Sequence, residues 1–336
     1  MKRITVYEAN DYITIGDGKN SLNQKEVELL QKFIKKEKLK STYISWEMGK
    51  FRFINYVGLI TIRGISIEIL PKTNKHNKED SRKSLINMLV NSRFIDINYS
   101  EITNIDLKNE NLLEILAYLF TIKMKKELSR GMYKEYVNQQ DNLTMIKGKL
   151  KIKEQLKNKS KKTLKAACEF DEFTEDNLLN GLFKSISLRL IKNIRTLKTL
   201  DNLNIILANF VDIEGRELNK YNFEKVKFHR NNQRFYESFI LMKKLLFGQN
   251  SLGEYGKDDG FCLLFEVNDL YEKYVGILCK SIDNSTSIQD KSEKLIIKAS
   301  NLIPVVQLKP DIFIPEKRII IDTKWKILKK SENRYG

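Results

Sequence analysis

The sequence predicts an α+β protein built from more than one domain. The chain has 336 residues, of which 41% are hydrophobic, and this length allows two or three domains with cores of their own. Its hydrophobic pattern changes twice, from mixed helix and strand to mainly helical, and then to a helix followed by strands. We therefore expect three segments, namely residues 1–75, 76–250 and 251–336.

Residues 1–75 predict a mixed α/β domain. Apolar side chains recur at three- and four-residue steps over residues 22–39, which predicts an amphipathic helix. Three strand-like runs follow, at residues 42–46, 50–55 and 59–70. Gly64 interrupts the last run, and the polar stretch 72–80 predicts a linker or an exposed loop.

Residues 76–250 predict a mainly helical domain. Amphipathic helices are expected at residues 112–128, 176–194 and 235–247. Between them, the stretch 147–165 carries nine lysines and one acid, Glu154. This stretch is either a surface that follows phosphates or the solvated face of a helix, and the second reading is slightly favoured.

Residues 251–336 predict a helix followed by three strands. A strand-like run at residues 261–267 precedes the helix, which is expected at 270–282. The three strands are expected at residues 294–299, 305–314 and 318–325. The apolar run Ile319-Ile320-Ile321 is typical of a strand in the middle of a sheet.

Charge and cysteine content narrow the class of protein. The net charge of +17 favours a polyanionic partner such as nucleic acid, although a lysine-rich genome would produce the same excess. The three cysteines form no C-x-x-C pair, which disfavours zinc ribbons and thioredoxin-like chemistry and indicates a reducing, cytoplasmic location. We expect no signal peptide and no membrane span, because the N-terminus turns polar at once and no apolar run is long enough.

Absent motifs narrow the chemistry further. The two histidines, His76 and His229, lie among Lys, Arg and Asn, which disfavours Ser-His-Asp hydrolysis and HNH-type cleavage. The sequence has no G-x-x-x-x-G-K-[ST] loop, so we do not expect the chain itself to hydrolyse nucleotides. Any chemistry must therefore depend on carboxylates and lysines.

Two strand-like runs around residues 315–318 predict an antiparallel hairpin. A turn centred between Glu316 and Lys317 places Asp311 opposite Asp322, with Cβ atoms about 4.5–5.5 Å apart. Two facing carboxylates repel each other, and a divalent cation is the obvious compensation. Oxygen ligands alone favour Mg²⁺ or Mn²⁺ over zinc.

Lys324 and Glu272 complete the predicted site. Lys324 lies two residues after Asp322 and therefore points to the same sheet face, where it can orient a water molecule or stabilise charge on a phosphate. A third acid is expected from the helix as an accessory metal ligand, and Glu272 is the candidate because it lies beside the apolar stripe. The plain alternatives are a hairpin whose strands end in polar residues, and an exposed glutamate that pairs with Lys273 or Lys280.

The helix, Pro310-Asp311 and Asp322-Thr323-Lys324 together resemble the PD-(D/E)xK nuclease superfamily. More narrowly, the chain resembles the McrC nuclease subunits of McrBC-type, 5-methylcytosine-specific restriction systems. Further stretches carry this likeness in order along the chain: Gly58-Leu59-Ile60, Ile67-Glu68-Ile69-Leu70-Pro71-Lys72, the D-E-F-x-x-D-x-x-x-N pattern of residues 171–180, Arg230-Asn231-Asn232-Gln233-Arg234 and Phe265-Glu266-Val267-Asn268-Asp269-Leu270-Tyr271-Glu272.

The resemblance implies a C-terminal mixed-sheet nuclease core of the PD-(D/E)xK type. Asp311 and Asp322 would be its metal ligands, Glu272 its helix acid, and Lys324 the residue that orients water or stabilises phosphate. It also implies a separate McrB-like AAA+ GTPase partner, which recognises modified cytosine and uses the GTP. The other implied partner is double-stranded DNA with modified cytosine, and residues 1–75 would dock on the motor.

The chain departs from that family's pattern after Lys324. A core of this kind continues with a helix and another strand, whereas the sequence stops at Gly336. We therefore expect a truncated core whose unpaired sheet edge favours association into dimers within the assembly. Three functions stay open: a Mg²⁺-dependent endonuclease subunit of a phage-defence restriction system, a non-cleaving regulatory or DNA-binding subunit, and a basic nucleic-acid-binding protein without a motor.

Overall fold

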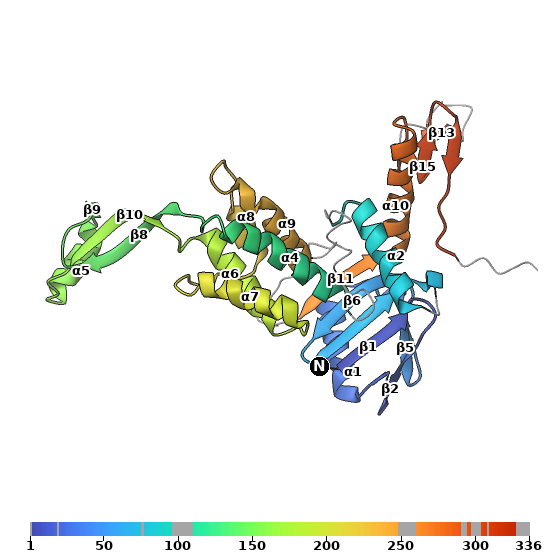
Figure 1. Cartoon of the computed structure of the whole chain (residues 1–336), viewed down its shortest axis with the longest axis horizontal. Helices are drawn as coiled ribbons and strands as arrows, with labels where there is room; N and C mark the ends of the chain where they lie inside the picture. The colour runs from blue at the N-terminus through green and yellow to red at the C-terminus, as the bar shows by residue number, and fades with distance from the viewer. Residues whose placement is uncertain are drawn as a thin grey trace, which may run out of the picture. The chain divides into compact units, whose positions relative to one another are not determined.

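The computed structural model describes residues 2–18, 20–74, 77–95, 110–247, 260–289 and 309–326, and the backbone of residues 294–296 and 304–307. The chain forms two compact units (Figure 1). Unit 1 comprises Met1–Leu116 and Lys244–Gly336, and unit 2 comprises Ala117–Lys243. The expected division into 1–75, 76–250 and 251–336 is therefore corrected, because a strand of the last segment pairs with a strand of the first.

The main sheet of unit 1 is built from both ends of the chain. Its strands are β1 (Lys2–Tyr7), β6 (Tyr56–Ile62), β7 (Ile65–Leu70) and β11 (Phe261–Glu266). Their order is β1-β7-β6-β11, with β1 parallel to β7 and the other pairs antiparallel. Every residue of β6, β7 and β11 is buried, as expected for continuous apolar strands that are covered on both faces.

A second sheet and one helix complete the N-terminal part of unit 1. The sheet has the order β3-β2-β5-β4 and is formed by β2 (Ile13–Ile15), β3 (Ser21–Leu22), β4 (Ile44–Glu47) and β5 (Lys50–Phe53). Helix α1 (Gln24–Lys36) begins with a capping box between Asn23 and Glu26. The predicted apolar stripe of α1 is confirmed, since its buried residues are Val27, Leu30, Phe33 and Ile34.

Two helices of unit 1 pack side by side (Figure 1), namely α2 (Lys78–Asn91) and α10 (Val267–Ile282). A buried bidentate ion pair ties α2 to β7, because the Arg82 guanidinium donates to both carboxylate oxygens of Glu68, at 2.8 and 2.6 Å. Such a pair combines two charge-assisted hydrogen bonds, so it fixes the helix on the sheet.

A small antiparallel sheet follows α10. Its order is β12-β15-β16, from β12 (Ser287–Ile288), β15 (Ile312–Ile314) and β16 (Ile319–Ile321), and β13 (Lys294–Ile296) pairs separately with β14 (Pro304–Gln307). The single strand expected at 305–314 is thus divided in two. The expectation of a central strand at 319–321 is wrong for the described sheet, because β16 lies at its edge and Ile319 and Ile320 are exposed.

The helices predicted for the middle of the chain are confirmed. They are α4 (Leu112–Leu128), α6 (Leu178–Ile191) and α9 (Tyr236–Phe247), joined by α7 (Leu197–Asn209) and α8 (Lys220–Lys225). Short 3₁₀ turns lie at η1 (Ser41–Tyr43), η2 (Lys72–Asn74) and η3 (Gln233–Phe235). No helix in the described ranges is long and apolar enough to cross a membrane, and all three cysteines carry free thiols.

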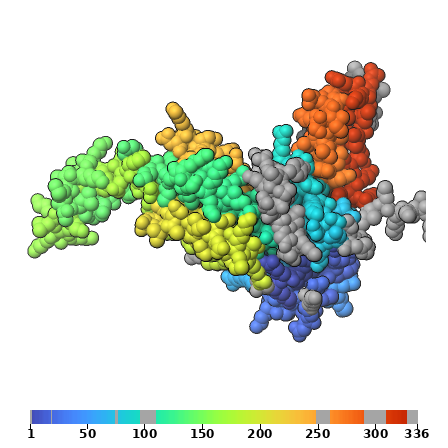
Figure 2. All heavy atoms as spheres, viewed as in Figure 1, coloured from blue at the N-terminus to red at the C-terminus, as the bar shows by residue number. Residues whose placement is uncertain are grey.

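Unit 2 also contains a sheet that the sequence does not predict. It has the order β8-β10-β9, from β8 (Glu135–Leu143), β9 (Lys149–Leu150) and β10 (Ala166–Thr174), and α5 (Ile152–Ser160) packs against β10. We call residues 135–174 the arm, which projects beyond the helices of unit 2 (Figures 1 and 2). Helix α5 buries no residue, so the lysine-rich stretch 147–165 does include a solvated helix.

Candidate active site

The β15–β16 hairpin has the predicted register. Ile312 pairs with Ile321, and Ile314 pairs with Ile319. Asp311 therefore directly precedes the first residue of β15, and Asp322 directly follows the last residue of β16, across from it. The hairpin thus brings the two predicted acids to the same open end.

Lys324 lies beside Asp322, as predicted from the shared sheet face. Its Nζ atom is 2.8 Å from Oδ2 of Asp322, and the two side chains are 65% and 63% exposed. The hydrogen bond from Lys324 and its positive charge hold the pKa of Asp322 below its usual range. The same hydrogen bond raises the pKa of Lys324. At neutral pH this pair is therefore a carboxylate and an ammonium group.

The segment that carries these groups lies beyond the end of β16 and is held by side chains. The backbone N–H and the hydroxyl of Thr323 both donate to Oδ2 of Asp311, at 2.7 and 2.9 Å. The indole N–H of Trp325 donates to Oε1 of Glu8, at 2.6 Å. Asp322 and Lys324 are exposed, whereas Thr323 and Trp325 are half-buried. Because exposure alternates along the segment, the side chains of Asp322 and Lys324 face solvent, while those of Thr323 and Trp325 hold the segment in place.

Glu272 reaches the same end of the sheet through one intermediate residue. Nε2 of Gln289 donates to Oε1 of Glu272 at 2.7 Å, and the backbone N–H of Gln289 donates to the carbonyl oxygen of Asp311 at 2.8 Å. Gln289 adopts a positive φ of 52°, which is uncommon outside glycine and marks a constrained position. The sequence gives no sign of Gln289, Thr323, Trp325 or Glu8 as partners of the site.

The described residues offer two carboxylates, rather than three ligands, for a hard divalent cation. Within the part of the chain that the structure describes, no three or more His, Cys, Asp and Glu side chains are placed to hold a metal ion. Asp311 and Asp322 alone match the way in which Mg²⁺ binds, since it takes one or two carboxylates and keeps several water molecules. A two-carboxylate site therefore fits, and the role of Glu272 as a third ligand stays a prediction.

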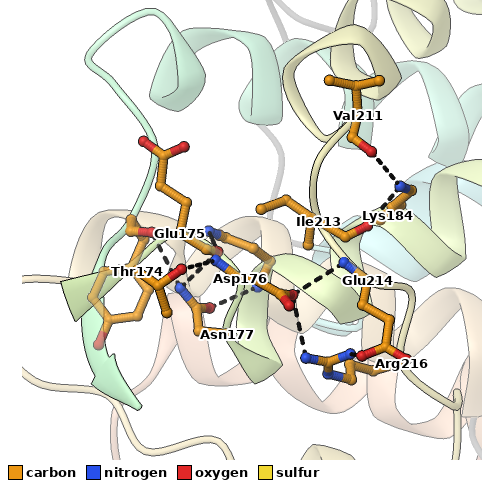
Figure 3. A network of polar contacts seen from close by, with 11 residues as sticks. Thr174, Glu175, Asp176, Asn177, Lys184, Val211, Ile213, Glu214 and Arg216 are labelled. Carbon is orange, nitrogen blue, oxygen red and sulfur yellow. Dashed lines mark hydrogen bonds and ion pairs between the residues drawn. The ribbon is translucent and has the colours of Figure 1, made fainter. Parts of the chain in front are cut away.

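The D-E-F-x-x-D-x-x-x-N stretch is a structural joint at the base of the arm (Figure 3). Oδ1 of Asp176 accepts from the backbone N–H of Glu214 at 3.0 Å and from the Arg216 guanidinium at 3.2 Å. The side chain of Asn177 caps α6, and the Asn180 amide donates to the carbonyl oxygens of Tyr133 and Glu175, both at 2.8 Å. These contacts tie the ends of β10 and β8 to α6.

The Arg/Asn-rich stretch has a similar structural role. The guanidinium of Arg234 donates to the carbonyl oxygens of Glu127 and Gly131, at 2.8 and 2.6 Å, and thereby satisfies carbonyls at the C-terminal end of α4. The buried side chain of Asn232 accepts from the backbone N–H of His229 and donates to the Lys227 carbonyl. Both stretches therefore have contacts that stabilise unit 2.

Known proteins resemble this chain in sequence and in fold. The Escherichia coli (strain K12) protein "Type IV methyl-directed restriction enzyme EcoKMcrBC" is 25% identical over 230 residues, which span 65% of this chain and 66% of that protein. The Thermococcus gammatolerans McrBC complex contains a chain with a TM-score of 0.62 at 24% identity, covering 82% of this chain and 87% of that one. An assembly of Thermococcus gammatolerans McrB AAA+ hexamers with bound McrC gives a TM-score of 0.70 at 22% identity, covering 95% and 79%.

The family match covers most of the chain. A family model described as "McrBC 5-methylcytosine restriction system component" matches residues 51–336. The matched region contains the β15–β16 hairpin, the arm and the joint at its base. The likeness to the two solved structures supports the same fold. The chain therefore belongs to the family of McrBC 5-methylcytosine restriction system components.

Proposed function

We propose that this chain is the DNA-cleaving, McrC-like subunit of a modification-dependent restriction system and acts on DNA that carries 5-methylcytosine. The hairpin supports this most directly, because its register brings Asp311 and Asp322 together with Lys324 beside them. Membership in a family of 5-methylcytosine restriction components agrees with this substrate. The proposed reaction is the hydrolysis of a phosphodiester bond in double-stranded DNA.

Each residue of the site has a proposed role. Asp311 and Asp322 hold a Mg²⁺ or Mn²⁺ ion, with Glu272 as an accessory acid. Such an ion supplies an activated water molecule and neutralises charge on the phosphate. Lys324 stays protonated beside Asp322, so it stabilises the negative charge that builds on the phosphate oxygens. Gln289 holds Glu272 toward the backbone of Asp311.

A plasmid-cleavage assay with the GTPase partner, GTP and Mg²⁺ tests this function. Asp322→Ala should lower the cleavage rate by at least about 100-fold, because it removes a ligand and the partner of Lys324. Glu316→Ala is the matched control, since it removes an exposed acid from the turn of the same hairpin. Equal cleavage by wild type and Asp322→Ala would show that the assigned site is wrong.

An AAA+ GTPase ring of the McrB type is the proposed partner. A chain of similar fold is found bound to McrB AAA+ hexamers. The arm offers a surface for such a contact, because it exposes many large apolar side chains, namely Tyr136, Met145, Ile146, Leu150, Ile152, Leu156, Leu164 and Phe173. Exposed apolar patches mark interaction sites. We infer that the arm, rather than residues 1–75 as expected from the resemblance, makes the main contact with the ring.

The docking surface can be tested separately from cleavage. Tyr136 and Phe173 pair across β8 and β10, with ring centroids 5.0 Å apart. Changing both to Ser should abolish stimulation of GTP hydrolysis by the partner. Met48→Ser is the matched control, because Met48 is fully exposed in the β4–β5 turn of the segment 1–75. Loss of stimulation with Met48→Ser alone would instead support docking through residues 1–75.

A second candidate function is a regulatory subunit that stimulates the partner and binds DNA without cutting it. The exposed side chains of Ile319 and Ile320 favour it, because within the described residues no further strand pairs with β16. Such a subunit would stimulate GTP turnover while the plasmid stays intact. Nicks or breaks made by wild type and absent with Asp322→Ala would exclude this candidate.

A further inference from the structure

Trp325, the residue directly after Lys324, is held by three elements of unit 1. Its indole N–H donates to Oε1 of Glu8, 2.6 Å away, just beyond the end of β1. Its ring lies 5.1 Å from the ring of Tyr271 on α10, centroid to centroid. Nζ of Lys72, which follows β7, is 6.0 Å from the ring centroid and 3.3 Å from Oε1 of Glu8. The residue next to the predicted catalytic lysine is therefore attached to the buried sheet.

Glu8 is a costly residue to keep at this place. It is 0% exposed, and its second carboxylate oxygen, Oε2, is buried without a hydrogen-bond partner. Burial raises the pKa of Glu8, while Trp325 and Lys72 act against that rise. A buried carboxylate destabilises a fold unless it is well paired. The contacts with Lys72 and Trp325 therefore explain how Glu8 can remain buried.

The attachment matters because no described strand pairs with this segment. Residues 322–325 follow the last strand pair and belong to no strand. Two side chains of this segment anchor it: Thr323 to Asp311, and Trp325 to Glu8. Thr323 holds the start of the segment against Asp311 of the hairpin. Trp325 holds the end of the segment against Glu8, which follows β1 of the main sheet. The position of Lys324 is therefore set between these two anchors.

We propose that Glu8 and Lys72 are positioning residues, which hold Trp325 and so fix the Asp322–Lys324 segment in the geometry that the cation and the scissile phosphate need. This inference rests on the proposed function and extends the site to the N-terminal end of the chain. Sites of this kind need their groups within about 0.5 Å of the productive geometry. A misplacement of about 1 Å can lower a rate about 100-fold.

Binding of Mn²⁺ to the full-length protein, measured by isothermal titration calorimetry, tests the proposal without using cleavage. Glu8→Ala should weaken Mn²⁺ binding about tenfold, because the far end of the segment is released. Glu8→Gln keeps an oxygen acceptor for the indole and should stay within about twofold of wild type. Trp325→Phe keeps a ring beside Tyr271 but removes the N–H donor, so it should weaken Mn²⁺ binding about as much as Glu8→Ala does. It therefore tests the same hydrogen bond if Glu8→Ala folds poorly.

Two further measurements, Trp325 fluorescence and the stimulation of the partner's GTP hydrolysis, distinguish a displaced segment from general unfolding of the protein. In a Trp46→Phe background, Trp325 is the only tryptophan, and Glu8→Ala should shift its emission to longer wavelength. Stimulation of the partner's GTP hydrolysis should stay unchanged, while single-turnover cleavage at saturating Mg²⁺ should fall about 10- to 100-fold.

The outcomes distinguish this inference from the proposed function. Unchanged Mn²⁺ affinity in both Glu8→Ala and Trp325→Phe would overturn the positioning role, whether or not the wild type cuts DNA. If these variants weaken Mn²⁺ binding but the wild type does not cleave with its partner, the proposed function fails and the positioning role stands. If the wild type binds no Mn²⁺, both fail together.

Discussion

The two sheets that flank α10 in unit 1 differ in almost every property that stabilises a sheet. In the main sheet, β6, β7 and β11 have six or seven residues each, and all of them are buried. In the small sheet, β15 and β16 have three residues each, and Ile320 of β16 is 66% exposed. The first sheet is part of the core, whereas the second ends, within the described residues, at the exposed strand β16.

Within unit 1, the residues that stabilise the fold are therefore different from the residues of the proposed site. Burial of apolar surface is the main favourable term in folding, so the main sheet carries the stability. Under the proposed function, the charged groups Asp322 and Lys324 meet a DNA backbone, and both side chains are exposed. The Glu8–Trp325 hydrogen bond connects the two regions. It attaches the exposed segment 322–325 to the buried main sheet.

A change at Gly58 should be the most damaging test of the main sheet. Gly58 has φ +124°, and a Cβ atom there would lie 1.9 Å from the carbonyl oxygen of Leu263. Gly58→Ala should therefore force β11 away from β6 and destabilise the protein by about 3 kcal/mol or more. Gly64→Ala is the control, because Gly64 also has a positive φ but has nothing within 4 Å, so it should cost only about 1 kcal/mol. Urea unfolding measures both, and equal losses would contradict the close approach.

A matched pair of isoleucines compares the two sheets directly. Ile67 of β7 is 1% exposed, whereas Ile320 of β16 is 66% exposed. Ile67→Ala should destabilise the protein by about 2–5 kcal/mol, since it leaves a cavity in the core. Ile320→Ala should change stability by less than about 0.5 kcal/mol. A large loss with Ile320→Ala in the isolated protein would mean that the edge of β16 is covered in solution, for example by a second copy of the chain.

The sequence was most informative where the pattern of residues is local. Three- and four-residue spacing predicted α1, an amphipathic pattern predicted α4, and the strand-like run at residues 59–70, interrupted at Gly64, predicted β7 and most of β6. The hairpin register that brings Asp311 and Asp322 to the same end followed from the turn alone, because a hairpin links residues close together in the chain. These features depend on neighbouring residues and need no knowledge of the rest of the fold.

The arm and the outer contacts of the site could not be predicted in this way. Strand β8 is mostly polar and contains no fully buried residue, so its sequence lacks the alternation of apolar and polar residues that identifies a strand. The Glu8–Trp325 hydrogen bond joins residues 317 positions apart, and no local pattern carries that information. The domain division failed for the same reason, because β11 completes a sheet begun near the N-terminus.

The smallest expected effect concerns the charge of the exposed site. Lys324 holds the pKa of Asp322 below its usual range, so Asp322 stays ionised, and able to bind a cation, to a lower pH than an isolated aspartate. In Lys324→Ala the pKa of Asp322 should rise toward its usual value, and Mn²⁺ binding should then be lost at a higher pH as the solution is acidified. Calorimetric Mn²⁺ titrations at several acidic pH values measure this shift. Lys317→Ala is the control, because Lys317 lies in the same hairpin but pairs with Asp283, and it should leave the acid limit of binding unchanged. A shift to lower pH in Lys324→Ala would mean that the lysine competes with the cation for Asp322 more than it protects the carboxylate from protonation.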